Sequence, residues 1–377
     1  MTRILPVAER TLQQGGLDYY DTAGLRLRRH GLMLTRCGDC WQLDRGDGRI
    51  CQLTAVEPDR VPDELRRLVR AYSRDLELVP VPGPAIERVR SVCPTARDVV
   101  LDYLEAQSAA LARADLAVRL DEPEGVHDLR VAARRIRATL RTFAPVLGGR
   151  RLVRNLCGSL RWLGESVGPA RDTEVQRERL RRRLDPVPLV AQQHFEAAAR
   201  QASAECGEAL DSHRYLQLLN ALEILDSVLR DQPRHDRPKA ARRPAAAVLP
   251  SLVWTVAAET DARVRAASRD RGPDAVHSVR KSVKRLRYAL EAAEDALPFA
   301  LQGVLADCRT LQDLLGEHQD AVVAGEWLRS MSARAAEPIP AFEALADAEK
   351  NAAVRCAAAL PSAWDSVLQG LEPLRDR

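Results

Sequence analysis

Two segments of the chain carry rows of basic side chains at helical spacing. The first row consists of His127, Arg130, Arg134, Arg137 and Arg141. The second row consists of His277, Arg280, Lys284 and Arg287, with Lys281 beside it. Steps of three and four residues place the members of a row on one helix face, about one turn apart. Guanidinium and ammonium groups bind phosphate oxygens through short, strong hydrogen bonds, so the rows predict an anion site.

Neither row contains the acidic residues that normally relieve repulsion along a helix. A basic side chain on a helix surface is usually balanced by Glu or Asp four residues away. The sequence has no carboxylate between Arg130 and Arg141, and none between Arg280 and Glu291. A pre-ordered row with uncompensated charge favours an anionic ligand, and a step of about 5.4 Å per turn suits an extended chain of phosphates. The alternative is that acids on neighbouring helices pair with the rows.

Each row begins with a histidine, and further candidates lie outside the rows. A histidine near several arginines is expected to be mostly neutral at neutral pH and to gain charge as the pH falls. Arg214 follows Ser212, which is expected to start a helix that runs to Arg230, and it either extends the basic surface or belongs to an ordinary capping region. Asp172 and Asp320 are placed to orient row arginines, but neither has a partner that would make a catalytic pair. We therefore expect no catalytic residue, no metal and no cofactor.

An internal repeat positions both rows. The segment Pro123–Arg130 recurs as Pro273–Arg280 at an offset of 150, and residues 168–172 match residues 316–320 at an offset of 148. Next to each row runs a stripe of apolar residues that we expect to be buried: Val126, Leu129, Ala133, Ile136, Leu140 and Phe143 in the first segment, and Val276, Val279, Val283, Leu286 and Leu290 in the second. The repeat predicts a duplicated helical bundle with approximate two-fold symmetry.

Composition and punctuation predict the domain organisation. The 377 residues are 46% hydrophobic and only 4% aromatic, which favours a mainly α fold, and the net charge of +4 requires any anion site to arise from local segregation. Residues 1–79 alternate short apolar segments with turn formers and predict a small α+β segment with hairpins and a helix starting at Pro62. Residues 80–84 are expected to form a Pro-rich linker. Residues 85–377 are expected to be helical, in halves of about 85–231 and 245–377, joined by an exposed connection.

Cysteine usage and hydropathy indicate the compartment. The chain has eight cysteines, no signal-peptide pattern and no apolar run long enough to span a bilayer, so we expect a cytoplasmic protein with reduced thiols and no membrane partner. Cys37, Cys40 and Cys51 with His30 could in principle supply four zinc ligands, although their spacing matches no strong zinc pattern.

The paired segments that begin at His127 and His277 resemble the CHAD family, the conserved histidine α-helical domain. The resemblance covers roughly residues 85–377. It implies two four-helix bundles related by a pseudo-two-fold axis, a basic central groove or pore, binding of inorganic polyphosphate and association with polyphosphate granules. It carries these roles onto His127, Arg130, Arg134, Arg137, His277, Arg280, Lys281, Lys284 and Arg287, and the basic spacing adds Arg141 and Arg214.

The N-terminal region resembles part of a CYTH domain, the triphosphate-tunnel fold. Tyr19–Leu32 is similar to one of its strand–turn–strand stretches, and Val61–Leu65 is similar to the start of its helix. The Glu-x-Glu-x-Lys strand that opens that fold is missing, as is about half of its length, so we interpret the segment as a degenerate, inactive remnant. Two other functions stay open beside polyphosphate binding: a nucleic-acid-binding protein that uses the same rows, and a tunnel-type triphosphatase, against which the missing acidic strand argues.

Overall fold

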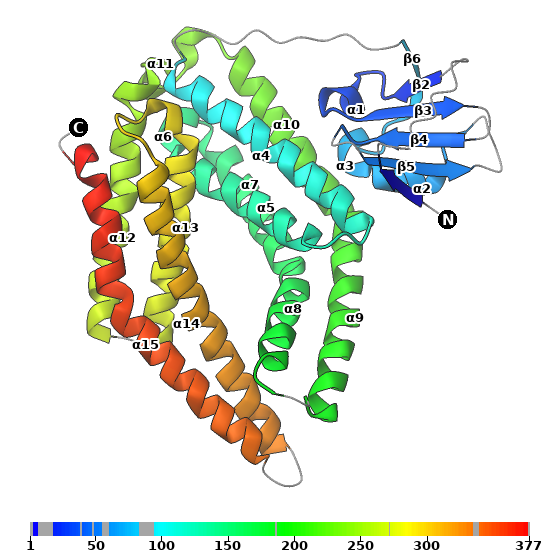
Figure 1. Ribbon diagram of the computed structural model, residues 1–377. Helices are drawn as coiled ribbons and strands as arrows, with labels where there is room; N and C mark the ends of the chain where they lie inside the picture. The colour runs from blue at the N-terminus through cyan, green and yellow to red at the C-terminus, as the bar shows by residue number, and fades with distance from the viewer. Residues whose placement is uncertain are drawn as a thin grey trace.

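The computed structural model describes residues 3–6, 18–37, 40–46, 49–54, 60–82, 94–184, 187–270, 272–334 and 339–375. The described chain is mainly helical, with a small β-sheet at its N-terminal end (Figure 1). The strands are β1 (Arg3–Pro6), β2 (Asp18–Asp21), β3 (Met33–Cys37), β4 (Cys40–Asp44), β5 (Arg49–Thr54) and β6 (Val79–Val81). The short helices of this segment are α1 (Arg26–Arg29), α2 (Asp63–Leu68) and α3 (Arg70–Ser73).

The helical region follows the sheet in two successive sets. The first set is α4 (Ala96–Arg119), α5 (Gly125–Thr142), α6 (Ala144–Leu147), α7 (Arg150–Ser166), α8 (Gly168–Arg181), α9 (Leu189–Asp211) and α10 (His213–Asp231). After α11 (Lys239–Arg242), the second set is α12 (Leu249–Asp270), α13 (Pro273–Ala292), α14 (Gln302–Arg334) and α15 (Pro340–Leu371). In the described part of the chain, no helix is both long and apolar enough to cross a membrane.

The N-terminal sheet is antiparallel, with strand order β1-β5-β4-β3-β2-β6. The expected hairpins are present as β3 with β4 and as β4 with β5. The stretch Tyr19–Leu32 differs from its expectation, because a helical turn, α1, separates β2 from β3; the Asp21 carboxylate accepts the backbone N–H groups of Leu27 and Arg28 and so holds this turn. The sheet also extends to Val81, into the stretch expected as a linker, because β6 is an edge strand and tolerates its proline.

The sheet register bears on the zinc alternative. Cys37 and Cys40 are cross-strand partners, whereas Cys51 pairs with Leu43, three residues along β4 from Cys40. Because side chains alternate between the two faces of a strand, Cys51 lies on the face opposite to Cys40. The backbone therefore does not bring Cys40 and Cys51 to one metal position. Among the residues that the structure describes, no group of three or more potential ligands surrounds a metal position.

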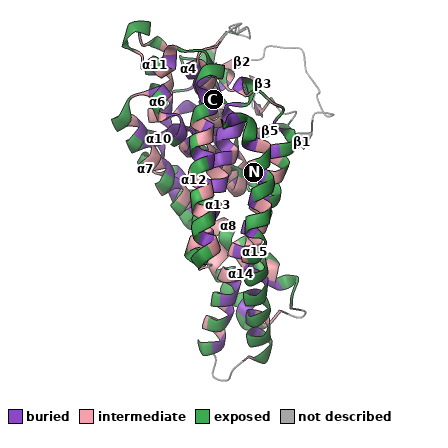
Figure 2. Ribbon diagram, turned by 90° about the vertical axis from the view of Figure 1, so that its left-hand side faces the viewer, coloured by how far each residue is buried: buried purple, intermediate pink, exposed green. Residues whose placement is uncertain are grey.

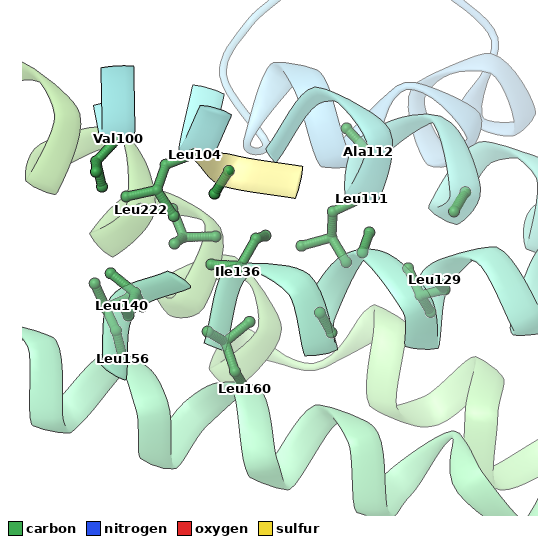
Figure 3. Close-up of a cluster of buried hydrophobic side chains, with 14 of the residues drawn as sticks. Val100, Leu104, Leu111, Ala112, Leu129, Ile136, Leu140, Leu156, Leu160 and Leu222 are labelled. Atoms are coloured by element: carbon green, nitrogen blue, oxygen red, sulfur yellow. The ribbon is translucent and has the colours of Figure 1, made fainter. Parts of the chain in front are cut away.

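Both repeat segments form the expected helices, α5 and α13. The apolar stripe of α13 is buried at all five expected positions, each at most 1% exposed. On α5, Leu129, Ile136 and Leu140 are fully buried against leucines of α4 and α7, and Val126 is half-buried (Figure 3). The burial of each stripe fixes the rotation of its helix, so the adjacent basic row must face away from that core.

The two helical sets differ in continuity. In the first set, α7 gives way to α8 at Val167, and α9 gives way to α10 at Ser212, whose side chain accepts the Tyr215 backbone N–H as an N-cap. In the second set, α14 and α15 run without interruption and pack along each other. The far ends of α8, α9, α14 and α15 lie away from the sheet and are largely exposed (Figures 1 and 2).

The connection between the two sets, residues 232–244, is packed more closely against the helices than the sequence predicts. Most of residues 232–244 are exposed or half-buried, but Ala241 in α11 is fully buried. Arg97 of α4, itself buried, donates hydrogen bonds to the Gln232 side chain and to the backbone oxygens of Leu229 and Leu147. The connection is thus packed onto α4, because a buried arginine needs several acceptors to offset its lost hydration.

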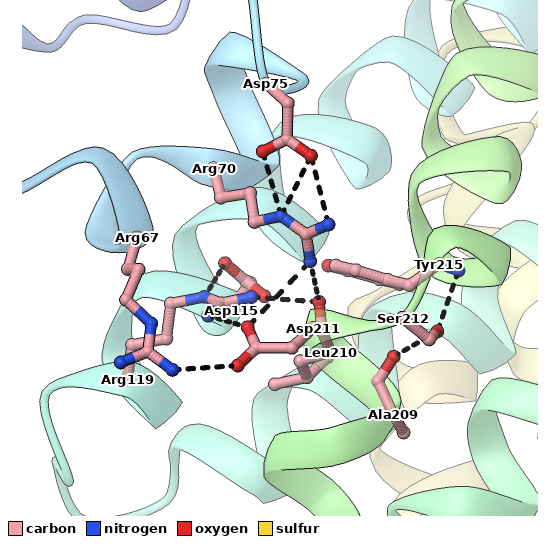
Figure 4. A network of polar contacts seen from close by, with 10 residues as sticks. All are labelled: Arg67, Arg70, Asp75, Asp115, Arg119, Ala209, Leu210, Asp211, Ser212 and Tyr215. Carbon is pink, nitrogen blue, oxygen red and sulfur yellow. Dashed lines mark hydrogen bonds and ion pairs between the residues drawn. The ribbon is translucent and has the colours of Figure 1, made fainter. Parts of the chain in front are cut away.

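An ion-pair network attaches the N-terminal segment to the helical region (Figure 4). The Asp211 carboxylate at the end of α9 pairs with Arg67 and Arg70 of the N-terminal segment and with Arg119 of α4. Arg119 also pairs with Asp115, which is completely buried. The Leu210 oxygen, one of the carbonyls without a helical partner at the end of α9, accepts bonds from Arg70 and Arg119.

Candidate anion-binding site

The two basic rows meet because α5 packs against α13. Polar contacts cross this interface: Arg135 of α5 donates to Glu291 of α13 at 3.0 Å, and Arg285 of α13 donates to the Thr142 hydroxyl of α5 at 3.1 Å. Tyr103 of α4 donates a further bond to Glu291. These contacts place the basic faces of two helices, far apart in sequence, next to each other.

A cavity of about 270 Å³ opens between the rows, and most of the residues in its wall are basic. It is lined by Arg134, Arg137 and Arg141 from α5, Arg263 from α12, and Lys281, Lys284 and Arg285 from α13, together with Ala138, Ser278, Ser282 and Tyr288. We call this space the basic cavity. Seven of its eleven lining residues carry a basic group and none is acidic. This charge distribution has the polarity required for a bound anion.

Lys284 lies where the two rows converge. Burial lowers the pKa of its ammonium group from 10.5 to about 6, and the neighbouring cations of Arg280, Arg134, Arg130 and Arg287 act in the same direction. Four guanidinium groups from two helices therefore surround one amine. At neutral pH the amine is mostly neutral in the absence of a ligand, because a fifth positive charge would be both desolvated and repelled.

Nearby acids neutralise two of the row residues, one from a neighbouring helix and one from the same helix. Arg130 donates to the Asp172 carboxylate at 2.9 Å and to the Gly168 oxygen at 2.7 Å, so Asp172 orients a row arginine as the sequence suggested. Arg287 pairs with Glu291 at 3.2 Å. The alternative, in which acids on neighbouring helices balance the rows, therefore holds for Arg130, whereas Arg287 is balanced within its own helix, α13.

Two arginines of the cavity wall, Arg263 and Arg285, share the Glu259 carboxylate. The remaining basic residues of the wall have no such balance. Within the described part of the chain, no carboxylate forms an ion pair with Arg134, Arg137, Arg141, Lys281 or Lys284. The uncompensated charge is thus concentrated in the basic cavity, on residues of both rows.

Arg280 lies beside this cluster with two acids nearby. Burial lowers the pKa of its guanidinium group and Arg134 reinforces the shift, whereas Asp320 and Asp172 oppose it. Burial likewise raises the pKa of the Asp320 carboxyl group, although Arg280 lowers it. The buried Nε atoms of Arg134 and Arg280 have no hydrogen-bond acceptor among the described residues. Both arginines therefore retain donor capacity for a ligand.

The row histidines are neutral in this setting. Burial, and then Arg171, lower the pKa of His127; burial, and then Lys281, lower the pKa of His277. Sequence reasoning passed over His318 on α14, which is 4% exposed and whose pKa is lowered by burial and by His277. The Nδ1 atoms of His277 and His318 have no hydrogen-bond partner in the described residues.

A sequence comparison identifies the family. The sequence profile of the CHAD domain matches residues 102–329. The chain belongs to the CHAD domain family. Among curated proteins, it is 31% identical over 279 residues to the uncharacterized protein Rv2226 of Mycobacterium tuberculosis strain H37Rv, and equally to the uncharacterized protein MT2285 of strain CDC 1551. The match covers 70% of this chain and 52% of each relative, so the chain spans about half the length of the curated relatives it matches.

Solved structures support the same fold. The CHAD domain from the plant Ricinus communis is 24% identical, with a TM-score of 0.56 over 78% of this chain and 98% of that one. The protein PptA from Streptomyces chartreusis is 22% identical, with a TM-score of 0.58 over 72% of this chain and 99% of that one. At these identities the likeness concerns the fold alone.

The CHAD helices distribute the predicted residues unequally. Arg134, Arg137, Arg141, Lys281 and Lys284 line the basic cavity, while Arg130, Arg280 and Arg287 surround Lys284. Arg214 lies elsewhere: its guanidinium group stacks over the Trp162 ring of α7 at 4.4 Å from the ring centroid. The sequence carried signals for two overlooked residues, because Arg263 matches Arg113 at the repeat offset and His318 lies within the segment that matches residues 168–172.

Proposed function

We propose that this CHAD protein binds inorganic polyphosphate without transforming it. The observation that carries the proposal is the basic cavity, whose wall presents seven basic side chains and no acidic one. Self-repulsion in such a partly buried cluster raises the free energy of the unliganded protein, and a polyanion supplies the missing charge. The binding residues are His127, Arg130, Arg134, Arg137, Arg141, His277, Arg280, Lys281, Lys284 and Arg287, with Arg214 on an outlying part of the surface.

The arrangement suits a chain of phosphates better than one compact anion. Each row runs along its helix with a step of about 5.4 Å per turn, so successive side chains reach successive positions of an extended ligand. Arg134 and Lys284 face the ligand from opposite helices. Neutral histidines at the start of each row donate one hydrogen bond apiece without adding repulsion.

A duplicated architecture accounts for the two rows. We infer that α4 and α5 correspond to α12 and α13, that α7 and α8 together correspond to α14, and that α9 and α10 together correspond to α15. In support, Arg130 packs against Gly168 and Arg280 packs against Gly316, which is the matching glycine of the repeat. Two four-helix units related by a pseudo-two-fold axis would place their basic faces together at that axis.

The N-terminal sheet fits a supporting role better than a catalytic one. Arg67 of α2 and Arg70 of α3 are engaged with Asp211, and the described strands form an open sheet with β1 and β6 at its edges. We interpret it as a degenerate relative of the triphosphate-tunnel fold that has no triphosphatase activity. Binding of a polymeric anion by the helical region agrees with association with polyphosphate granules in the cytoplasm.

The cavity argues for polyphosphate over nucleic acid. Nucleic-acid channels combine basic side chains with exposed aromatic rings on which bases stack. Tyr288 is the aromatic residue of the basic cavity, and it is only 3% exposed because Arg135 and Arg287 lie over its ring. The wall therefore offers no free ring face to a base.

Binding of long-chain polyphosphate at two salt concentrations, with single-stranded RNA as competitor, tests the proposal. Tight binding that weakens with salt and resists RNA is expected, and the slope of log affinity against log salt counts the phosphates neutralised. Absence of binding, or displacement by RNA, would contradict it. Incubation with triphosphate and Mg²⁺ or Mn²⁺ should release no phosphate, and release would instead support the triphosphatase alternative.

A further inference from the structure

Helix α7 carries a second row of basic residues that the proposed site does not use. Arg150, Arg154 and Arg161 follow one another at intervals that keep them on one face of α7, within about 40° of each other at 100° per residue. All three are exposed, and Arg151 is exposed beside them. In the described part of the chain, no carboxylate forms an ion pair with any of these four arginines. We call Arg150, Arg154 and Arg161 the α7 stripe.

The α7 stripe continues the wall of the basic cavity. Helices α5 and α7 pack against each other. Arg137, which lines the cavity, is close enough to Arg161 for the two charges to repel, since Arg141, Arg161 and Arg134 all lower the Arg137 pKa beyond the effect of burial. Cys157, between Arg154 and Arg161 on α7, lies near both Arg137 and Arg141. A continuous run of cations thus leads from the cavity onto the outer face of α7.

The segment of the second half that matches α7 in the repeat does not carry this excess of positive charge. Helix α7 carries four arginines and Glu165, a net charge of +3. The segment 298–314, which matches it at the offset of 148, carries Asp307, Arg309 and Asp313, a net charge of −1. A polyanion that leaves the cavity therefore meets positive potential on the α7 side and negative potential on the α14 side.

We propose that the α7 stripe is a second binding segment for polyphosphate, which takes the part of a long chain that extends beyond the basic cavity. This inference rests on the proposed function. It adds the direction in which a bound chain leaves the cavity, along α7, and a preference for long polyphosphate chains. The stripe runs about 16 Å along α7 from Arg161 to Arg150, given a rise of 1.5 Å per residue. Short chains fill the cavity alone, and long chains gain the additional contacts.

The test compares tripolyphosphate with long-chain polyphosphate on three forms of the full chain. The first is wild type and the second is Arg154→Gln/Arg161→Gln, which removes two charges while keeping good helix formers. The third is the matched control Arg200→Gln/Arg309→Gln, which removes two exposed charges from α9 and α14. Circular dichroism and thermal unfolding establish that each form is folded.

The α7 variant should bind long chains roughly ten-fold more weakly than wild type and bind tripolyphosphate as wild type does. Its salt slope for long chains should also fall by about 1.4, since two phosphate contacts are lost. The control should match wild type for both ligands. A long-chain affinity equal to that of the control would overturn the inference and leave the proposed function standing.

Equal weakening for both chain lengths would also overturn it, because the stripe would then act within the cavity. Failure of wild type to bind either ligand would instead refute the proposed function itself, together with the inference built on it. The two failures are therefore distinguishable in one set of titrations.

Discussion

The α5 and α13 rows share one sequence pattern but hold their charge differently. On α5, the row residues in the cavity wall are all arginines, and the guanidinium group of arginine is not deprotonated in proteins. On α13, the residue that matches Arg134 is Lys284, whose pKa is about 6. The arginines of the first row are thus always charged. Lys284, at the centre of the second row, is protonated only when a nearby negative charge or a lower pH favours its charged form.

This difference shows how the folded protein can accommodate a cluster of basic side chains when no ligand is bound. Five fully charged groups at the convergence of the rows would repel each other strongly, and burial would weaken screening by salt. A lysine at the centre relieves the repulsion by losing a proton, which an arginine could not do. A polyanion would reverse this, since a nearby negative charge favours the protonated amine.

The largest expected effect is on the free energy of unfolding. It comes from substitutions in the apolar stripe that lies next to each basic row. Ile136→Asp on α5 and Leu286→Asp on α13 each bury a carboxylate at a completely buried position. Each should destabilise the fold by at least about 4 kcal/mol, since no partner is available for the buried charge. Denaturant unfolding followed by circular dichroism measures this. A stable, native-like Ile136→Asp protein would show that this stripe is not the core of its half.

Charge reversal of the matched pair should give the next largest effect. Arg134→Glu/Lys284→Glu is expected to weaken long-chain polyphosphate binding at least about 100-fold, because two charged contacts become repulsive. Helicity should be unchanged, and the melting temperature should not fall, since the reversal removes internal repulsion. Arg177→Glu/Arg181→Glu on α8, which reverses two exposed charges away from the cavity, serves as the control. Wild-type affinity in the Arg134/Lys284 variant would refute the site.

The pH dependence of stability should separate the two rows. The Lys284 pKa is about 6 in the folded protein and 10.5 in the unfolded chain, so between these values the unfolded state binds more protons. Lys284 therefore contributes an increase in stability as the pH rises from 6 to 10.5. Lys284→Met should have a larger free energy of unfolding than wild type near pH 7. This difference between the two proteins should decrease towards pH 10. For Arg134→Met, the difference in free energy of unfolding from wild type should not decrease in this way over the same pH range.

Denaturant unfolding of these three proteins at several pH values provides the measurement. Calorimetric titration with polyphosphate in buffers of different ionisation enthalpy adds a second readout. Wild type should take up protons on binding near pH 7.5, and Lys284→Met should take up fewer. Parallel stability profiles and identical proton uptake in wild type and Lys284→Met would show that Lys284 stays charged without ligand.

The smallest effect concerns Arg130, a row arginine whose acidic partner is exposed. Asp172→Asn removes the carboxylate that holds Arg130, and Asp172 is 69% exposed. Exposed ion pairs contribute about 1 kcal/mol or less, so polyphosphate affinity should rise about two- to five-fold as Arg130 becomes available to the ligand. Glu174→Gln, on the same helix, is the control. A loss of affinity in Asp172→Asn would mean that Asp172 positions Arg130 for binding.

Particular residues show how far sequence reasoning reached. The helical stripes of α5 and α13 were predictable because a periodicity of 3.6 residues reports directly which side of a helix is buried. Ser212 was recognisable as a helix start because its hydroxyl can cap a backbone N–H, and it caps Tyr215. The hairpin of β3 and β4 was likewise visible in the alternation of apolar and polar residues.

Other features were beyond the sequence because they depend on partners far along the chain. Glu291 lies at the end of the second row, but its bonds to Arg135 and Tyr103 come from residues more than 150 positions earlier. The position of Arg214 over Trp162 likewise depends on how α10 packs against α7. Local spacing contains no information on such approaches.

The sequence by itself determined that the chain contains two matching amphipathic helices, each with a core stripe and a basic row, since both properties follow from residue type and helical period. Only the tertiary structure decided that the rows converge at Lys284 and that Asp172, on another helix, neutralises Arg130. It also decided that Arg134, Arg137 and Arg141 have no acidic partner among the residues that the structure describes. The reason is physical: the pKa and the free charge of a side chain depend on its burial and on neighbours supplied by other helices.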